Sequence, residues 1–227
     1  MGKILLHACC GPCSIYCTKL LKEKNIDFEI LWYNINIHPF KEYEQRRDTL
    51  IDLYKDTDIK VNVLEDYGLV EFTRNVVNKE NARCPFCYEA RLRKTAEYAK
   101  EHGFAGFTTT LLISPYQNHE LIKHIGEKIA KEYGLEFVYI DFRPGFKEGQ
   151  EEARNLGIYM QKYCGCIYSE MDRYEKQIKR DKEKYMWWKL DKLVEVMRLI
   201  KTGKLSQHCW DNLVGVIMLE FYIIMCI

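Results

Sequence analysis

The chain contains 227 residues, with 34 lysines and arginines against 33 aspartates and glutamates and a net charge of +1. This length fits one domain with a full hydrophobic core, or one domain with a small appendage. Hydrophobic residues at 47% and charged residues at 30% exclude disordered, collagen-like and low-complexity proteins. The near-zero net charge gives no overall support for nucleic-acid binding, which would therefore depend on local patches.

Ten cysteines are the unusual feature of this composition. The chain starts Met1-Gly2-Lys3 and runs into an apolar segment, without the charged and then apolar leader of a secreted protein. We therefore expect a cytoplasmic protein. In that compartment, closely spaced cysteines indicate metal or redox chemistry rather than disulfides.

Short apolar runs alternate with amphipathic stretches through the first two thirds of the chain. Strands are predicted over residues 3–8, 28–34, 61–64, 106–110 and 136–140. Helices are predicted between them, over residues 14–24, 40–55, 85–102 and 114–133. This alternation favours an α/β fold in which a parallel sheet has helices on both faces. Ligands of such folds lie at the carboxyl ends of the strands.

The pattern changes after Asp141. Residues up to Cys166 are predicted to form a loop, and residues 168–200 a long helix. We therefore expect an α/β domain over residues 1–166 and a C-terminal helical segment over residues 167–227 that packs on it.

The predicted long helix is locally basic. Residues 167–201 hold 10 lysines and arginines against 7 aspartates and glutamates, an excess of +3. One interpretation of this composition is a solvent-exposed helix face on which neighbouring charges form ion pairs. The alternative is a surface that follows phosphates, with Tyr185, Trp187 and Trp188 available for stacking.

An apolar tail ends the chain. Residues 213–227 carry a single charge, at Glu220, and are too few for a membrane-spanning helix. We expect a buried terminal helix or strand there, with an oligomer contact as the alternative and a membrane anchor as the least favoured interpretation.

Eight of the ten cysteines occur in three places, namely Cys9, Cys10, Cys13 and Cys17, then Cys84 and Cys87, then Cys164 and Cys166. The first two groups open predicted helices, and the third lies in a loop before one. Helix N-termini lower thiol pKa values and favour the thiolate, which is the form that binds metal. A Cys-x-x-Cys at a helix start lets two sulfurs converge on one metal, as does a Cys-Gly-Cys around a glycine turn.

Three interpretations of these thiols compete: buried core cysteines, a structural zinc site and an iron–sulfur centre. Two pairs supply the four thiolates that either zinc or a cluster requires. The additional thiols favour the iron–sulfur centre, because they leave ligands for further metal or redox chemistry.

Cys9 and Cys10 raise a geometric question. Neighbouring side chains of an extended backbone point to opposite sides, so these two share one small centre only if the turn reorients them. Otherwise they serve two neighbouring centres. Cys13 is a possible accessory, Cys17 is expected to pack inside one helical turn later, and Cys209 and Cys226 are assigned no chemistry.

Two further residues are candidates for catalysis. His7 lies two residues before Cys9, although a histidine on a buried strand is more often a hydrogen-bonded core residue. Asp141 follows the last predicted strand, where its carboxylate could cap a helix, bind metal or move protons. The sequence contains no Gly-rich dinucleotide fingerprint, Walker loop or nucleophile elbow.

Five stretches together resemble one family, the epoxyqueuosine reductases of the QueH type. They are LLHACCGPCS (5–14), NIHPFKEYEQR (36–46), RCPFCYEARLRKTAEYA (83–99), FTTTLLISPY (107–116) and YMQKYCGCIYS (159–169). The resemblance spans residues 3–169 and implies a fold related to the nucleotide-hydrolase-like, PP-loop-like α/β proteins that include tRNA thiolases. The Cys-Cys loop would stand where those enzymes keep a phosphate-binding loop.

The resemblance also implies a reaction, the reduction of epoxyqueuosine to queuosine in tRNA, and a [4Fe-4S] cluster with an additional iron ion. We assign one combined metal site to the cysteines Cys9, Cys10, Cys84, Cys87, Cys164 and Cys166. Asp141 is the candidate oxygen ligand or proton relay, and His7 is a candidate catalytic residue. Thr108, Thr109, Thr110, Ser114 and Tyr116 could line the substrate pocket, although a threonine run at a strand end is equally typical of ordinary β-structure.

The expected partners are a tRNA anticodon loop that carries epoxyqueuosine and an external electron donor, with no membrane. The basic helix after Cys166 is the expected tRNA-docking surface. Two alternative functions stay open, a cluster-dependent tRNA sulfur-transfer enzyme and a non-catalytic iron–sulfur electron carrier or sensor.

Overall fold

The computed structural model describes residues 2–203, which fall into two units whose boundary in the chain lies between Arg173 and Tyr174. Helix α7 (Ile167–Lys201) begins in the first unit and forms most of the described part of the second. Residues 213–227, with Cys209 and Cys226, lie outside the described residues. Within residues 2–203, no helix combines the length and apolar character needed to cross a membrane. Packing of the C-terminal segment on the first domain stays a prediction.

Five parallel strands form one sheet in the order β3-β2-β1-β4-β5. Their bounds are β1 (Ile4–Ala8), β2 (Phe28–Trp32), β3 (Val61–Val63), β4 (Gly106–Thr109) and β5 (Glu136–Phe137). All five lie within the predicted strands, so the predicted α/β fold with a parallel sheet is confirmed. Every residue of the central strand β1 is buried, as a strand covered on both faces requires.

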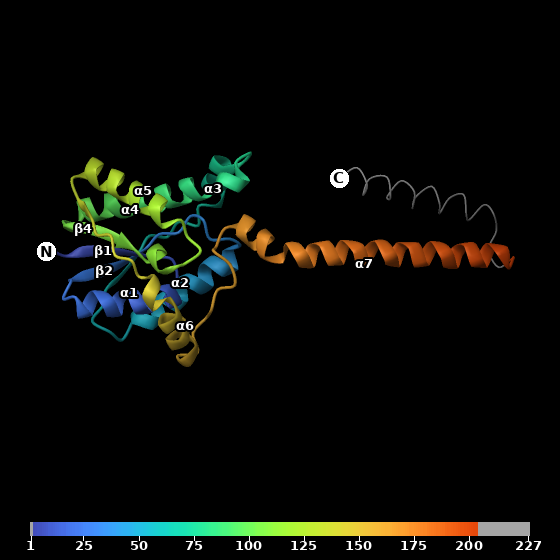
Figure 1. Cartoon of the computed structure of the whole chain (residues 1–227), viewed down its shortest axis with the longest axis horizontal. Helices are drawn as coiled ribbons and strands as arrows, with labels where there is room; N and C mark the ends of the chain where they lie inside the picture. Colours follow the sequence, from blue (N-terminus) through green and yellow to red (C-terminus); the bar gives the residue numbers. More distant parts are fainter. Residues whose placement is uncertain (1, 204–227) are drawn as a thin grey trace. The chain divides into compact units, whose positions relative to one another are not determined.

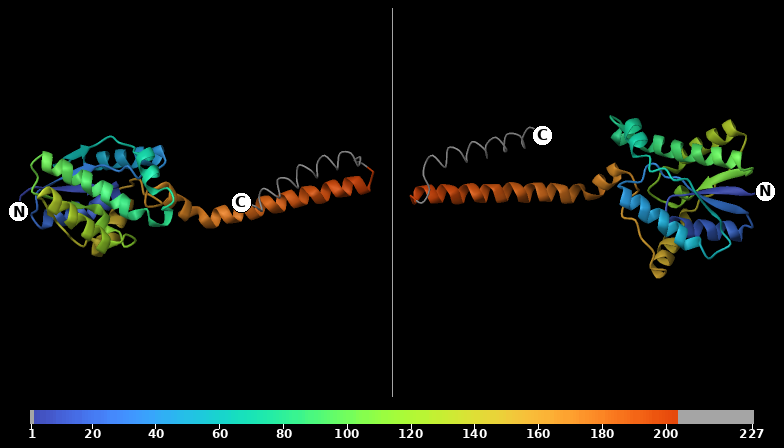
Figure 2. Two further views of the ribbon diagram at one scale, coloured as in Figure 1. Left: turned by 90° about the horizontal axis from the view of Figure 1, so that it is seen from above. Right: turned by 180° about the vertical axis from the view of Figure 1, so that it is seen from behind.

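Helices cover both faces of this sheet (Figure 1). On one face α1 (Gly11–Glu23) packs against α2 (Phe40–Tyr54), and α6 (Phe146–Asn155) packs beside α1. On the other face α4 (Cys84–Glu101) packs against α5 (His119–Tyr133), with α3 (Leu69–Val76) beside α4. The view from behind in Figure 2 shows the same two layers.

Two helices of the structure are absent from the sequence prediction, and each has a local cause. Helix α3 follows Gly68, whose φ of +58° is an unusual conformation for a residue that precedes a helix. Helix α6 contains Gly149, which weakens the helical pattern. A Cβ at this glycine would lie 3.3 Å from the Cβ of Tyr16, so the missing side chain allows α6 to approach α1.

Two predicted elements are shorter than expected. The helix predicted from residue 114 begins at His119, because the side chain of Asn118 caps it by accepting a hydrogen bond from the backbone N–H of Leu121 at 3.1 Å. The strand predicted over residues 136–140 pairs only through Glu136 and Phe137.

The strand order creates a crevice at the carboxyl ends of β1 and β4. The chain runs from β1 to β2 on one side and later returns through β4 on the other, and such a reversal opens a ligand site. Cys9 directly follows β1, and Thr110 directly follows β4. The backbone N–H of Cys9 donates to the Thr110 hydroxyl at 3.2 Å, so residues after both strands meet there.

A cluster of charges ties three strand regions together. Glu29 of β2 lies 2.9 Å from the ammonium of Lys3 and 3.2 Å from that of Lys60, and it accepts a hydrogen bond from Asn62 at 2.8 Å. Partial burial raises the pKa of Glu29, but the hydrogen bonds from Asn62, Lys3 and Lys60 outweigh this effect and lower it to about 2.

We predict that Glu29→Gln lowers the free energy of unfolding at pH 7 by about 1 kcal/mol. The folded-state pKa lies below the unfolded value, so this stabilisation is present above about pH 4.5 and is lost as the pH falls towards 2. Urea unfolding of the wild type and the variant at several pH values measures the difference. It should shrink below pH 4.5, whereas Glu136→Gln at an exposed strand position should change little at any pH. A pH-independent difference for Glu29→Gln would contradict the assignment.

Candidate metal centre and substrate pocket

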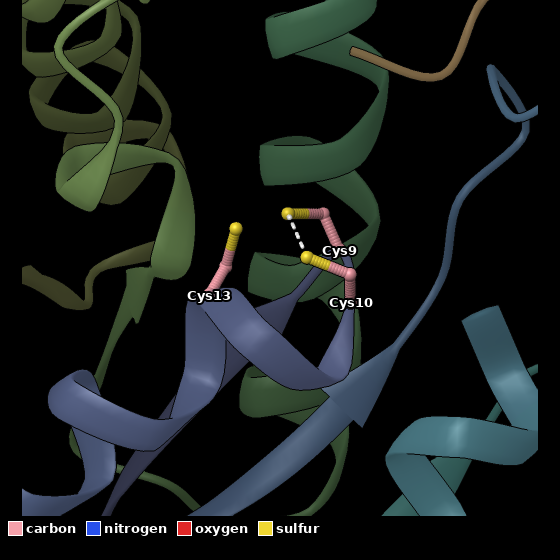
Figure 3. A group of neighbouring side chains, drawn as sticks. All are labelled: Cys9, Cys10 and Cys13. Carbon is pink, nitrogen blue, oxygen red and sulfur yellow. Dashed lines mark hydrogen bonds between the residues drawn. The ribbon is translucent and has the colours of Figure 1, made fainter. Parts of the chain in front are cut away.

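Three cysteines converge where β1 leads into α1 (Figure 3). Cys9 and Cys10 occupy the connection, and Cys13 lies in the first turn of the helix. The three sulfur atoms all lie within 4.8 Å of one another and are buried, with 3.8 Å between those of Cys9 and Cys10. The turn therefore reorients the adjacent thiols so that they face one space. Cys13 belongs to this group as well, which the sequence indicated only through its Cys-x-x-Cys spacing from Cys10.

The three thiols do not hold their protons equally. Hydrogen bonds from Cys10, Cys13 and the Thr110 hydroxyl hold the pKa of the Cys9 thiol well below its usual range, despite the burial of that thiol. Burial raises the pKa of Cys10. Cys17 is fully buried in the main core and lies outside the group, as predicted.

The other four candidate cysteines come from the start of α4 and the loop before α7. Cys87 and Cys166 are buried in one small cluster with Phe72 and Val76, whereas Cys84 and Cys164 are exposed. Burial raises the pKa of the Cys87 thiol to about 12, and nearby charge on Cys164, Cys166 and Cys84 adds to this effect. All eight cysteines of residues 2–203 are free thiols.

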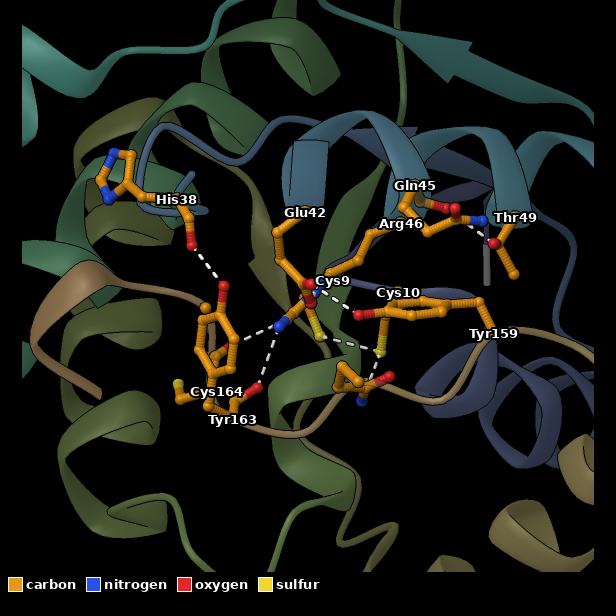
Figure 4. Close-up of polar contacts among 12 residues, drawn as sticks. Cys9, Cys10, His38, Glu42, Gln45, Arg46, Thr49, Tyr159, Tyr163 and Cys164 are labelled. Atoms are coloured by element: carbon orange, nitrogen blue, oxygen red, sulfur yellow. Dashed lines mark hydrogen bonds and ion pairs between the residues drawn. The ribbon is translucent and has the colours of Figure 1, made fainter. Parts of the chain in front are cut away.

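The guanidinium of Arg46 fixes the loop that carries Cys164 and Cys166 (Figure 4). This side chain of α2 is only 1% exposed. It donates to the carbonyls of Cys164 and Tyr163, each at 2.9 Å, and to the Glu42 carboxylate at 2.7 Å. A planar group with fixed donors thus binds two successive carbonyls and its own counter-ion.

Further hydrogen bonds support the same loop. The Tyr163 hydroxyl donates to the His38 carbonyl at 2.5 Å, and the His38 backbone N–H donates to the Gly165 carbonyl at 2.8 Å. Gly165 has a φ of +146°, and a Cβ there would lie 3.2 Å from both Asn36 and Ile37. The Cys-Gly-Cys turn therefore requires its glycine, as the sequence predicted.

Most of the candidate sulfurs accept a hydrogen bond from the surrounding protein. The donors are Thr110 to Cys9 at 3.5 Å, Gln161 to Cys10 at 3.0 Å and Cys13 at 3.5 Å, Arg91 to Cys87 at 3.0 Å, Gln117 to Cys164 at 3.3 Å and the Ser169 backbone to Cys166 at 3.4 Å. Donors of this kind orient metal-bound thiolates and stabilise their charge. Soft thiolate ligands with outer hydrogen-bond donors fit zinc or an iron–sulfur centre.

An open pocket of about 360 Å³ lies against the first cysteine group. Its wall includes the ligand candidates Cys9, Cys13 and Cys164. Three of the five predicted pocket residues, Thr110, Ser114 and Tyr116, also line it. Thr108 and Thr109 are instead fully buried within β4. Three carboxamide side chains that the sequence did not single out face the same pocket, namely Gln117, Gln150 and Gln161.

His7 is fully buried in β1 and does not line the pocket. One ring nitrogen lies 3.1 Å from the Tyr33 carbonyl and the other 2.9 Å from the Thr109 hydroxyl. Since a carbonyl only accepts, Nε2 carries the proton, and Nδ1 accepts from the hydroxyl. Burial, helped by the Arg91 charge, lowers the pKa of His7 to about 4. These contacts match the core interpretation, and its catalytic role stays a prediction.

Asp141 lies outside the cysteine group. Its carboxylate accepts two hydrogen bonds from the Arg143 guanidinium, at 2.8 and 2.7 Å, and a third from the Arg143 backbone at 3.0 Å. These contacts hold the pKa of Asp141 below its usual range. They form an ion pair and a short turn with Arg143 rather than a helix cap, because the cap residue of the following 3-10 helix is Phe142. The role of Asp141 as an oxygen ligand or proton relay stays a prediction.

Comparison with known proteins decides the family. The family model "Epoxyqueuosine reductase QueH" matches residues 4–172. The chain belongs to the QueH family. An epoxyqueuosine reductase QueH of Dehalococcoides mccartyi is 37% identical over 174 residues, covering 77% of this chain and 96% of that protein. The protein of the same name from Thermotoga maritima is 35% identical over 186 residues, covering 78% and 94%.

All six cysteines of the predicted metal site, and Cys13, lie inside the matched QueH region. So do Arg46, Arg91 and the glutamines of the pocket, which the sequence analysis missed. The sequence does contain a signal for the two arginines, because each is a charged residue at a position on the apolar, buried face of its helix. Tyr43 and Leu50 flank Arg46 on that face of α2, and Tyr88 and Leu92 do so for Arg91 on α4.

We predict that Gly165→Ala lowers the iron content of the anaerobically reconstituted protein, because the added Cβ forces the Cys164–Cys166 turn away from Asn36 and Ile37. The strained backbone should also destabilise the protein by about 1–3 kcal/mol. Gly157→Ala is the matched control, since that glycine has a φ of +64° but open space around its Cβ position. Equal iron content in both variants would contradict a role of this turn in the metal site.

Proposed function

We propose that this protein reduces epoxyqueuosine in tRNA to queuosine. The reaction takes up two electrons and two protons, breaks both C–O bonds of the epoxide, and releases water and an alkene. Membership of the QueH family over residues 4–172 is the observation that carries the proposal. Buried thiols beside an open pocket support it, because such a site can deliver electrons to a bound substrate.

The ligands that we propose for the bound group are Cys9, Cys10, Cys84, Cys87, Cys164 and Cys166, with Cys13 added from its position in the first group. A [4Fe-4S] cluster and an additional iron, when bound, would supply the electrons and a Lewis acid for the epoxide oxygen. An external donor must provide the two electrons of each turnover. We keep a cytoplasmic location as part of this proposal.

The pocket offers this substrate both polar and aromatic contacts. Tyr116 is 86% exposed and meets the ring of Phe146 edge-on, with 6.2 Å between the ring centroids. Both line the pocket, so a base that leaves the anticodon loop can stack there. Gln117, Gln150 and Ser114 provide hydrogen-bond donors and acceptors for its edges.

Protons for the departing oxygen are available on the same wall. Lys162 lines the pocket. We propose Lys162 as a proton source for the water that forms.

Anaerobic turnover of an RNA stem–loop that carries epoxyqueuosine, with dithionite as reductant, tests the proposal. We expect the nucleoside to lose one oxygen atom in mass spectrometry without consumption of ATP. The double variant Cys84→Ser/Cys87→Ser should lose both its visible cluster absorption and this activity. Cys17→Ala, at a buried cysteine outside the proposed ligand set, is the control.

A double variant that kept both properties would refute the ligand assignment. ATP-dependent gain of sulfur by the RNA would instead indicate a tRNA sulfur-transfer enzyme. Reversible redox chemistry of the cluster without turnover of the RNA would indicate an electron carrier or sensor. Zinc without sulfide in the purified protein would indicate a structural site.

We further propose that the basic helix α7 contributes to tRNA binding. Its aromatic side chains are exposed, with Trp187 at 65% and Trp188 at 53%. Tyr185 stacks on Trp188, and the ammonium of Lys192 lies 5.9 Å from the centroid of the same indole. Exposed aromatic and cationic groups of this kind suit single-stranded or looped RNA.

Charge reversal of Lys179 and Arg180 to glutamate should raise the apparent KM for tRNA and flatten its salt dependence, while kcat changes little. Both side chains are exposed and interact within the helix, Lys179 with Glu175 and Arg180 with Gln177. Lys55→Glu, at an exposed lysine of the α/β domain, is the control. Unchanged KM and salt dependence would remove this segment from the binding surface.

A further inference from the structure

Arg91 of α4 is a charged side chain in the interior of the first unit. Only 1% of it is exposed. An arginine keeps its proton in proteins, so its positive charge is buried with it. Burial of a charge is strongly unfavourable unless a partner of opposite charge compensates it.

The described residues provide no carboxylate for this purpose. Within residues 2–203, no aspartate or glutamate lies within ion-pairing distance of Arg91, whereas the other buried arginine, Arg46, pairs with Glu42 at 2.7 Å. Arg91 instead donates from Nε to the Cys87 carbonyl and from Nη2 to the Cys87 sulfur, both at 3.0 Å. Within residues 2–203, the one side chain to which Arg91 donates a hydrogen bond is therefore that of a candidate metal ligand.

The position of Arg91 also relates the two cysteine groups. Its charge interacts with Cys87 and Cys164 of the later group and with Cys9 of the first. The same charge helps to lower the pKa of His7, whose ring is therefore neutral and adds no competing positive charge. The sulfur that Arg91 contacts can compensate its charge, because sulfur carries negative charge when it binds a metal.

We propose that Arg91 is the counter-charge of the metal-bound thiolates and a positioning residue for Cys87. This inference deepens the proposed function and rests on its metal-bound thiolates. A buried cation and an N–H···S hydrogen bond both favour the more negative, reduced form of an iron–sulfur centre. Arg91 therefore raises the reduction potential of that centre and strengthens its binding.

The test uses the full chain reconstituted anaerobically with ferrous iron and sulfide. Arg91→Lys keeps the charge but loses the planar set of guanidinium N–H donors. Arg91→Met removes the charge with a side chain of comparable length. Arg93→Met is the matched control on the same helix, because Arg93 is partly exposed and pairs with Glu89 and Glu132. Spectroelectrochemical titration gives the reduction potential of each protein.

We expect the potential to fall in the order wild type, Arg91→Lys, Arg91→Met, with Arg93→Met close to the wild type. Metal affinity should fall by about 10- to 100-fold in Arg91→Met, as for other residues that contact metal ligands. Loss of the centre in Arg91→Met alone, with Arg91→Lys still loaded, supports the same conclusion. An unchanged potential and affinity in Arg91→Met, an equal shift in Arg93→Met, or failure of both Arg91 variants to load would overturn it.

The metal-free protein provides a second readout, which separates charge compensation from ordinary packing. Without metal, the sulfur that Arg91 contacts is a protonated thiol, because burial raises the pKa of Cys87 to about 12. Arg91→Met should therefore keep or raise the thermal midpoint of the metal-free protein while it destabilises the loaded protein. A lower midpoint in both forms would assign Arg91 a structural role only and overturn the proposal.

Failure of the proposed function gives a different result. If the wild type binds zinc without sulfide, the reductase proposal fails, and zinc affinity of the same variants then tests the counter-charge. An approximately 10-fold or larger loss in Arg91→Met supports it, and an unchanged zinc affinity overturns it.

Discussion

The buried guanidinium of Arg46 is the interaction on which the metal site most depends. The segment between α6 and α7 contains no strand that would pair with the sheet, yet it carries Cys164 and Cys166. Arg46 of α2 holds this segment in place by donating hydrogen bonds to the carbonyls of Tyr163 and Cys164. Because Glu42 compensates its charge, Arg46 can remain inside the protein while it holds this loop.

The sheet provides the other half of the site. Parallel strands end at one edge, and the change of direction at β1 leaves a crevice between the ends of β1 and β4. Cys9, Cys10 and Cys13 enter this crevice directly after β1, so the rigid central strand fixes their positions. Cys9 and Cys13 after the strand end therefore line the same pocket as Cys164 of the loop.

Much of this arrangement follows from the sequence. The alternation of apolar runs and amphipathic stretches located all five strands, helix α4, which begins at Cys84, and helix α5, which ends at Tyr133 before Gly134. Short helices escaped prediction because their signals depend on packing. Gly149 weakens α6 in isolation, but it permits the contact with Tyr16 that stabilises α6 in the protein.

The sequence by itself determined the α/β class, the six candidate cysteines and the resemblance to QueH proteins, because these depend on residue types and local spacing. Only the tertiary structure decided that Cys9 and Cys10 face one space, that Cys13 joins them, and that Arg46 and Arg91 lie inside. The physical reason is that these features depend on backbone direction at a turn and on partners far apart in the chain. Arg46 reaches Cys164, and Gln161 reaches Cys10, only after the chain has folded.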